Sequence, residues 1–196
     1  MTTASTRTSI AVVIVAIVLG AVAAIVLLYL AATFNRLVRL RNEAETGWAN
    51  IDVQLKRRAD LVPNLVEAVK GYAAHERETF DEVTKARAAA QQASGPAQAA
   101  QADAQLAGGL NKLLAVSEAY PQLRASENFL ALQQELADIE DKLAAARRYY
   151  NQTVYRYHTV KQSFPAVLVA GLLGFREREF FGTDERDVPA VSFAQT

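Results

Sequence analysis

The feature that most constrains this chain is an uninterrupted apolar run near its N-terminus, from Ile10 to Ala32. The run reads IAVVIVAIVLGAVAAIVLLYLAA and contains no charged residue. A helix needs about 20 apolar residues to cross the hydrocarbon core of a bilayer, which is roughly 30 Å thick. Because lipid offers no partners to backbone N–H and C=O groups, a single spanning segment must be helical.

Two other interpretations of this run are weaker. The core helix of a soluble protein is rarely apolar on every face over such a length. The apolar region of a cleaved signal peptide is about 7–15 residues long, and here no polar cleavage region interrupts the pattern. The run therefore predicts an uncleaved membrane anchor over residues 10–32, preceded by a polar lead over residues 1–9.

The composition of the chain limits what the remaining residues can do. Residues 33–196 are about the size of one domain. Lys plus Arg and Asp plus Glu both number 21, and this balance does not support nucleic-acid binding, which usually shows a basic footprint. The absence of Cys excludes thiolate metal sites and Cys nucleophiles. We therefore expect no nucleic-acid partner.

Three arginines, Arg36, Arg39 and Arg41, follow the apolar run. By the positive-inside tendency they weakly favour a cytoplasmic location for the C-terminal domain, with the periplasmic or extracellular face as the alternative. The same side chains are candidates for contact with anionic lipid headgroups. A solvated helix face, offset by Glu43 and Glu45, is the plainer interpretation.

Helical periodicity continues beyond the anchor. Apolar residues recur at steps of three and four over residues 37–55, which predicts a helix that emerges from the membrane without a strong break. Pro63 cannot donate an interior helical bond, so we expect a kink or restart at Asp60–Pro63, with Asp60 as a possible cap. A second stripe over residues 65–83 predicts a helix from about Pro63 to about Ala93.

Residues 88–107 are rich in Ala and Gln and contain few large apolar groups. We expect a flexible connection at about 91–109, with Gly108-Gly109 as a second weak point. A short helix over residues 106–117 should then stop at Tyr120-Pro121.

The most regular pattern is a heptad-like seam near the end of the chain. It predicts a long helix from about Ala125 or Ser126 to Phe164-Pro165, of the kind found in coiled coils. The helix cannot bury its seam alone and needs the two earlier stripes against it. The predicted fold class is therefore all-α: one N-terminal transmembrane helix, then an elongated antiparallel helical bundle over residues 33–165. The seam residues are Phe129, Leu132, Leu136, Ile139, Leu143, Ala146, Tyr150, Val154 and Tyr157.

The C-terminal tail, residues 166–196, is different. Its first ten residues carry no charge but are too few to span a membrane. Exposed apolar patches usually mark an interface with protein or membrane, although the tail can equally fold back on the bundle. Residues 188–193 look extended, because Pro189 biases its neighbours away from helix. The candidate interaction residues are Val167, Leu168, Leu172, Leu173, Phe175, Phe180 and Phe181.

A set of short segments spread along the chain is recognisable. These segments are NRLVRLRN at 35–42, IDVQLKRR at 51–58, DLVPNLVE at 60–67, VKGY at 69–72, HE at 75–76, EAYP at 118–121, FLALQ at 129–133, AR at 146–147, YN at 150–151, GF at 174–175 and FF at 180–181. Together they resemble the LemA family of bacterial membrane proteins. The resemblance covers about residues 35–193, and its motifs are specific. It implies a single N-terminal anchor in the bacterial plasma membrane and an elongated antiparallel helical bundle, and it implies no established enzymatic activity or cofactor.

The chain shows no arrangement of residues that indicates catalysis. His75 does not begin a zinc-protease motif, because Thr79 stands where the second His is needed. Tyr72 and Tyr155 lie three positions before His75 and His158, so the Glu-x-x-His pairs of di-iron bundles are missing. No Gly-rich phosphate loop occurs. We therefore expect no enzyme activity, no cofactor and no metal site.

Two functions of different classes fit these observations. The first is a membrane-anchored, non-enzymatic scaffold or adaptor that self-associates or docks other membrane proteins through its bundle and apolar tail. The second is a membrane-remodelling or envelope-stress protein that binds lipid through the C-terminal segment, since an apolar segment too short to span can lie in the membrane interface.

Overall fold

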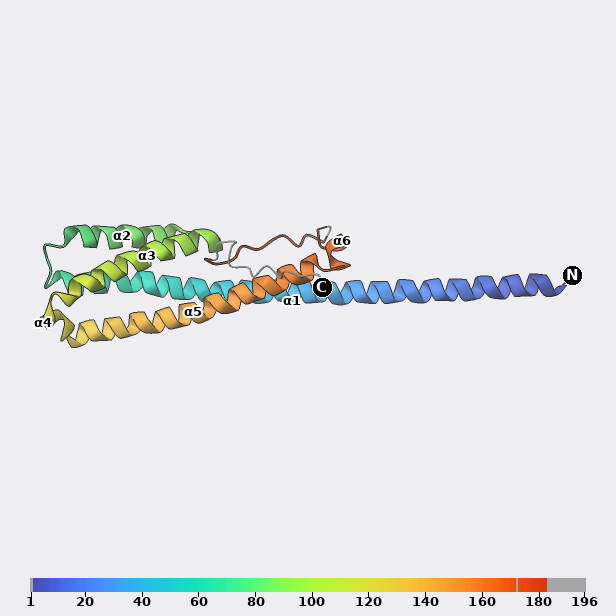
Figure 1. Cartoon of the computed structure of the whole chain (residues 1–196), viewed down its shortest axis with the longest axis horizontal. Coiled ribbons are helices and arrows are strands. Elements are labelled where there is room, and N and C mark those ends of the chain that lie inside the picture. The colour runs from blue at the N-terminus through green and yellow to red at the C-terminus, as the bar shows by residue number, and fades with distance from the viewer. Residues whose placement is uncertain (1, 172, 183–196) are drawn as a thin grey trace, which may run out of the picture. The chain divides into compact units, whose positions relative to one another are not determined.

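The computed structural model of the chain describes residues 2–171 and 173–182 (Figure 1). Within these residues the secondary structure is entirely helical, without any strand, so the all-α prediction is confirmed. The elements are α1 (Thr2–Lys70), α2 (Arg77–Gln92), α3 (Gly95–Glu118), α4 (Pro121–Arg124), α5 (Glu127–Gln162) and α6 (Ala166–Ala170).

The chain divides into two compact units. The first unit comprises residues 1–42 and 156–177, and it contains the N-terminal part of α1, the end of α5 and all of α6. The second unit comprises residues 43–155 and 178–196, and it contains the rest of α1 and α5 together with α2, α3 and α4.

Residues 13–29 of α1 are exposed on every face of the helix. Each large aliphatic side chain from Val13 to Leu28 exposes half or more of its surface. Among the described residues, α1 is the helix long and apolar enough to cross a membrane, judged by length and composition. This suggests a single-pass membrane protein, in agreement with the sequence.

The expected restart at Asp60–Pro63 is wrong, because α1 continues through Pro63 to Lys70, whereas the kink stays a prediction. Proline lacks the N–H that would bond to the carbonyl four residues earlier, which here belongs to Ala59. Arg87 of α2 supplies a substitute, since its Nε donates to the Ala59 carbonyl oxygen at 2.8 Å. A donor from a neighbouring helix thus satisfies the acceptor that Pro63 leaves without its helical partner.

The expected continuous helix from about Pro63 to about Ala93 is also wrong. α1 ends at Lys70, residues 71–76 form a turn region, and α2 begins at Arg77. Gly71 directly follows the last helical residue, and a basic residue closes the last turn, which is a common way for a helix to end. The backbone N–H groups of Tyr72 and Ala73 both bond to the carbonyl of Val69.

The region expected to be a flexible connection, about 91–109, is mostly helix. Its first two residues complete α2, and α3 continues from Gly95 through Gly108-Gly109 to Glu118. Gly109 serves packing, because a Cβ at this position would lie 3.2 Å from the Cα of Val83 on α2. The missing side chain lets the backbones of α2 and α3 approach closely.

In the second unit, α1, α2, α3 and α5 form a four-helix bundle with alternating direction (Figure 1). α1 and α5 run antiparallel, because Arg58 pairs with Glu140 while Gly47 lies against Tyr150. Short connections between successive antiparallel helices are typical of up-and-down bundles. The larger core cluster contains residues from all four helices and from α4, among them Leu65, Val83, Leu110, Leu123 and Leu136.

The long helix predicted from the heptad-like seam is confirmed as α5, Glu127–Gln162. All of the seam residues are buried except Ala146, which is partly buried. The first unit has a smaller core of its own, formed by Leu37, Leu40, Tyr157, Val160, Ala170 and Phe175. There the Tyr157 hydroxyl donates to the carbonyl oxygen of Arg176 at 2.7 Å.

Candidate functional site

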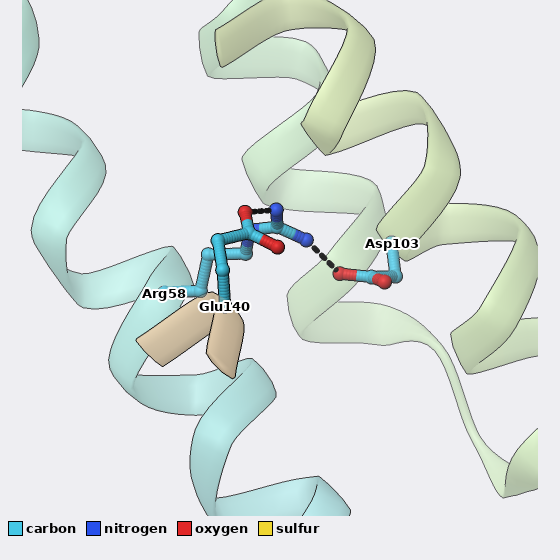
Figure 2. Close-up of polar contacts among 3 residues, drawn as sticks. All are labelled: Arg58, Asp103 and Glu140. Atoms are coloured by element: carbon cyan, nitrogen blue, oxygen red, sulfur yellow. Dashed lines mark hydrogen bonds and ion pairs between the residues drawn. The ribbon is translucent and has the colours of Figure 1, made fainter. Parts of the chain in front are cut away.

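Three charged side chains from three helices meet in the second unit (Figure 2). Arg58 of α1 is buried, and its Nη1 donates to Oδ1 of Asp103 on α3 at 2.6 Å. Asp103 is buried as well, with 7% of its side chain exposed. The Nη2 of Arg58 pairs with Oε1 of Glu140 on α5, whose side chain is 45% exposed. We call these three residues the charge cluster.

The charge cluster links α1 to α3 and to α5. An unpaired buried charge costs several kcal/mol, and two carboxylates offset that cost for Arg58. Within the described part of the chain, Nε of Arg58 and Oε1 of Gln54 are buried without a hydrogen-bond partner.

The second polar feature is a short C-terminal strap, residues 178–182, bound on the second unit. The Tyr150 hydroxyl donates to the carbonyl oxygen of Glu179 at 2.7 Å. The side-chain amide of Asn151 makes two bonds with the backbone of Phe181, donating to its carbonyl at 3.0 Å and accepting from its N–H at 2.9 Å. The Phe181 ring is buried, with the Arg147 guanidinium 5.0 Å from its centroid.

Burial also changes the acidity of the tyrosine that holds the strap. The pKa of Tyr150 is raised to about 12, mainly because burial disfavours the phenolate. The nearby Arg178 charge lowers this pKa and the Glu179 charge raises it, both by less. Tyr150 therefore remains a neutral hydrogen-bond donor at physiological pH and is not an activated base.

The structure separates the candidate residues of the tail. Phe175 and Phe181 belong to the chain's own cores, in the first and the second unit respectively, so their side chains are not a free interaction surface. Phe180 is partly buried. Val167, Leu168 and Leu173 are 50%, 65% and 48% exposed. Leu172 and the stretch 188–193, which looked extended, lie outside the described residues.

The candidate headgroup residues Arg36, Arg39 and Arg41 are all exposed on α1 in the first unit. They follow the apolar part of the same helix, as the sequence predicts. His75 is exposed and His158 is partly buried. Among the described residues, no group of three or more His, Cys, Asp or Glu side chains is placed to hold a metal ion.

Two hollows open on the second unit. One, of about 550 Å³, lies around α4, and the other, of about 510 Å³, lies between α1 and the facing ends of α2 and α3. In the second hollow Lys56 is already paired with Asp52 at 2.6 Å. The side chains of neither hollow form a nucleophile–base pair. The main lining residues are Leu114, Ser117, Glu118, Pro121, Arg124 and Leu130 in the first, and Trp48, Asp52, Leu55, Lys56, Asp60 and Gln91 in the second.

Comparison with known proteins decides the family. The model of the LemA family matches residues 47–193, which is most of the chain. This protein belongs to the LemA family. The match includes the bundle helices of the second unit and the strap, so the resemblance noted from the sequence is confirmed.

Curated relatives of this LemA-family chain are distant in sequence. The magnetosome protein MamQ of Magnetospirillum gryphiswaldense is 25% identical over 174 residues, which cover 76% of this chain and 64% of MamQ. MamQ 2 of Paramagnetospirillum magneticum has the same identity and coverage. Protein LemA of Metamycoplasma hominis is 26% identical over 155 residues, covering 77% of this chain and 69% of the relative. The chain thus spans less than two thirds of the MamQ relatives.

Sequence reasoning missed how the LemA-family residues come together. Tyr150-Asn151 and Phe180-Phe181 were noted as separate parts of the resemblance, yet they form the two sides of the strap contact. Arg58 stands in the sequence only as part of the segment IDVQLKRR, and its burial was not predicted. Its burial could have been suspected, because Arg58 lies four residues after Gln54 and seven after Ile51, on the apolar side of the helix.

Proposed function

We propose that this LemA-family protein is a membrane-anchored, non-enzymatic scaffold that self-associates or docks other membrane proteins through the outer faces of its helical bundle. One observation carries the proposal. α1 is a single helix whose N-terminal part is apolar and exposed on every face, and whose C-terminal part is one of the four bundle helices. A partner bound to the bundle is therefore kept beside the membrane.

The side-chain chemistry of the described residues supports a docking role over catalysis. The buried charges of Arg58 and Asp103 pair with each other, and Tyr150 is held in its neutral form. The hollow around α4 is lined by Leu114, Pro121 and the half-exposed Leu130, which are residues suited to packing. Apolar groups of this kind are common in protein contacts.

We place the bundle on the cytoplasmic side, because Arg36, Arg39 and Arg41 follow the apolar run. The chain has no Cys, so Leu130→Cys introduces a single accessible thiol. In intact spheroplasts a membrane-permeant maleimide should label this thiol, and a charged, impermeant one should not. Equal labelling by the impermeant reagent would put the bundle on the outer face.

The docking role is tested by crosslinking from the bundle in native membranes. A photo-crosslinker on Val53→Cys or Leu130→Cys, two exposed positions in the second unit, should give adducts with a second copy or with another membrane protein. Excess unlabelled chain should compete for these adducts. The matched control is Leu19→Cys in the exposed apolar part of α1, which reports chance neighbours in the lipid. If the bundle positions give no competed adduct, the proposal fails.

The absence of metal chemistry is a separate prediction. Purified protein should contain no stoichiometric transition metal, and His75→Ala and His158→Ala should change stability at most. Elemental analysis of the wild type and both variants checks this. A finding of one metal ion per chain that is lost in either variant would contradict the proposal. The chain would then have a metal site that its residue spacing does not predict.

A further inference from the structure

The segment that joins α5 to the strap is an apolar elbow, described at residues 163–171 and 173–175, which contains α6. From Gln162 to Phe175 the chain has no charged residue, and Lys161 and Arg176 flank this stretch. The elbow lies wholly within the first unit. Ten to fifteen uncharged residues are too few to cross a bilayer, so the elbow must satisfy its apolar groups in another way.

The elbow has an inner face and an outer face. The inner residues Ala166, Ala170 and Phe175 are buried, and Ala170 and Phe175 join the core of the first unit. The outer residues Phe164, Val167, Leu168 and Leu173 are 78%, 50%, 65% and 48% exposed. Within a stretch of ten residues, this is the kind of contiguous apolar exposure that marks an interface.

The inner face fixes where along α1 the elbow sits. The ring of Phe175 meets the ring of Phe34 edge-on, with centroids 5.5 Å apart and an angle of 68°. Burial along α1 begins at the same level, because Leu30 is partly buried and Thr33 is buried, whereas the large side chains from Val13 to Leu28 are all exposed. The elbow is thus docked where the membrane-spanning part of α1 ends.

The rise of an α-helix per residue gives the depth of the elbow in the bilayer. Phe34 lies two residues after Ala32, the last residue of the apolar run, and two residues rise by about 3 Å along the helix. The headgroup layer on each side of the hydrocarbon is about 5–8 Å thick. Phe34, and with it the elbow, therefore falls inside the headgroup layer when α1 spans the bilayer.

The charges around the elbow fit such a position. Arg36 and Arg39 are exposed on α1 directly after Phe34, and Arg176 is exposed at the end of the elbow. Lys161 pairs with Glu177 at 3.6 Å and contributes less. Basic residues next to an apolar insertion are attracted to anionic headgroups.

We propose that the elbow is a second membrane contact, in which the outer face inserts into the interfacial layer of the bilayer that α1 spans. The occupant is lipid, because the contact between Phe175 and Phe34 places the elbow beside the end of the exposed apolar run of α1, and the elbow itself carries no charged residue. A short apolar segment held in the interface binds by inserting its side chains at the boundary between headgroups and acyl chains. The inference requires an inserted α1 but not the docking role of the bundle.

The test measures where an elbow side chain resides in the full 196-residue chain. Leu168→Cys carries an environment-sensitive fluorophore, and the protein is reconstituted into vesicles of phosphatidylcholine and phosphatidylglycerol. The matched control is Tyr72→Cys, at a 45% exposed position in the turn between α1 and α2 of the second unit, outside both hollows. Nitroxide-labelled lipid should quench the Leu168→Cys label at least about 3-fold more than the control label, and aqueous iodide should quench it less.

Two outcomes overturn the proposal. Equal iodide quenching at both positions would mean that the elbow faces water. Weak quenching by lipid and by iodide, together with energy transfer between labelled copies at low protein density, would mean that a second copy covers it. As a further check, Leu168→Asp should lower lipid quenching of a label on Leu173→Cys while helical content stays unchanged. The crosslinking from Val53→Cys and Leu130→Cys does not depend on any of these results.

Discussion

The two parts of α1 are built for two different surroundings. From Thr8 to Asn35 the helix carries no charge and its large aliphatic side chains between Val13 and Leu28 are exposed on every face. From Leu37 to Val69 the large apolar residues are buried or partly buried except Val53, and the same stretch buries the guanidinium of Arg58. One continuous helix thus avoids charge where it is fully exposed and buries a charge where it is enclosed.

The difference lies in what the surroundings can donate or accept. In the bundle, Asp103 and Glu140 reach Arg58, and Arg87 reaches the Ala59 carbonyl that Pro63 leaves without its helical partner. Lipid supplies no such groups, so every polar or charged atom in the spanning part would stay unpaired. The free-energy cost of a charged side chain in a helix therefore depends on the partners that neighbouring helices provide. Hydropathy alone does not determine this cost.

The largest effect is expected from removing a partner in the charge cluster. Asp103→Ala leaves the buried Arg58 without its buried carboxylate, and this should lower the free energy of unfolding by about 3–5 kcal/mol. Chemical denaturation of the full chain in detergent micelles measures it. Glu140→Gln is the control, because the half-exposed Glu140 is partly solvated and its loss should cost clearly less.

A double variant separates the charge from the packing. Arg58→Met combined with Asp103→Ala removes the unpaired charge, so it should recover much of the lost stability, as hydrophobic replacements of buried ion pairs often do. If the double variant is no more stable than Asp103→Ala alone, the loss of stability comes from lost packing and not from an unpaired charge. The two parts of α1 would then not differ in how they accommodate a charge.

The next largest effect is expected from shortening a leucine in the core of the bundle, compared with a leucine in the exposed apolar part of α1. Leu143→Ala in the buried seam of α5 should lower the free energy of unfolding by about 2–5 kcal/mol, and Leu136→Ala should behave alike. Leu27→Ala, at a position 66% exposed in the spanning part of α1, should leave the unfolding of the bundle nearly unchanged. Thermal unfolding followed by circular dichroism compares the variants. Equal losses would mean that the two parts of α1 share one core.

A charge placed in the spanning part should instead affect membrane insertion. Leu19→Arg puts a cation near the middle of the apolar run, where it disfavours insertion by about 2.5–3.5 kcal/mol. The fraction that resists an alkaline carbonate wash should fall, whereas Leu130→Arg on the bundle should leave it unchanged. Unaltered retention of the Leu19→Arg variant would speak against a single spanning helix at residues 10–32.

The sequence predicts features that depend on neighbours along the chain. The charge-free run, the seam from Phe129 to Tyr157 and the end of α5 before Pro165 follow from helical periodicity and local breakers. Prediction from the sequence fails where a contact with a residue far away in the chain outweighs a local helix-breaking preference. Pro63 stays inside α1 because Arg87 bonds to Ala59, and Gly109 stays inside α3 because Val83 packs on it.

The candidate site shows the same division. The exposure of Val167 and Leu168 agrees with an interaction surface, but Phe175 and Phe181 have the same apolar chemistry and are buried. Only the tertiary contacts distinguish these residues, because Asn151 fixes the backbone of Phe181 and Phe34 receives the ring of Phe175. The Arg58–Asp103 pair joins residues 45 positions apart and has no local signal.

The smallest effect is expected at Tyr150, whose hydroxyl has a hydrogen-bond acceptor in the second unit that lipid would not provide. Tyr150→Phe removes the hydroxyl that donates to the Glu179 carbonyl, and this should lower the free energy of unfolding by about 0.5–1.5 kcal/mol at pH 7. Tyr149→Phe is the control, because Tyr149 is 43% exposed. Denaturation at neutral pH compares the two variants with the wild type.

The same hydroxyl gives the wild type a distinct dependence on pH. Burial raises the pKa of Tyr150 to about 12 in the folded state, whereas a tyrosine in an unfolded chain has a pKa near 10. The folded state holds this proton more tightly, so the stability that it contributes is fully present below pH 10 and is lost as pH rises toward 12. Tyr150→Phe has no such proton, so its free energy of unfolding should fall less than that of the wild type over this range. Parallel curves for the two proteins would show that the Tyr150 hydroxyl is solvated, and that the strap does not enclose it.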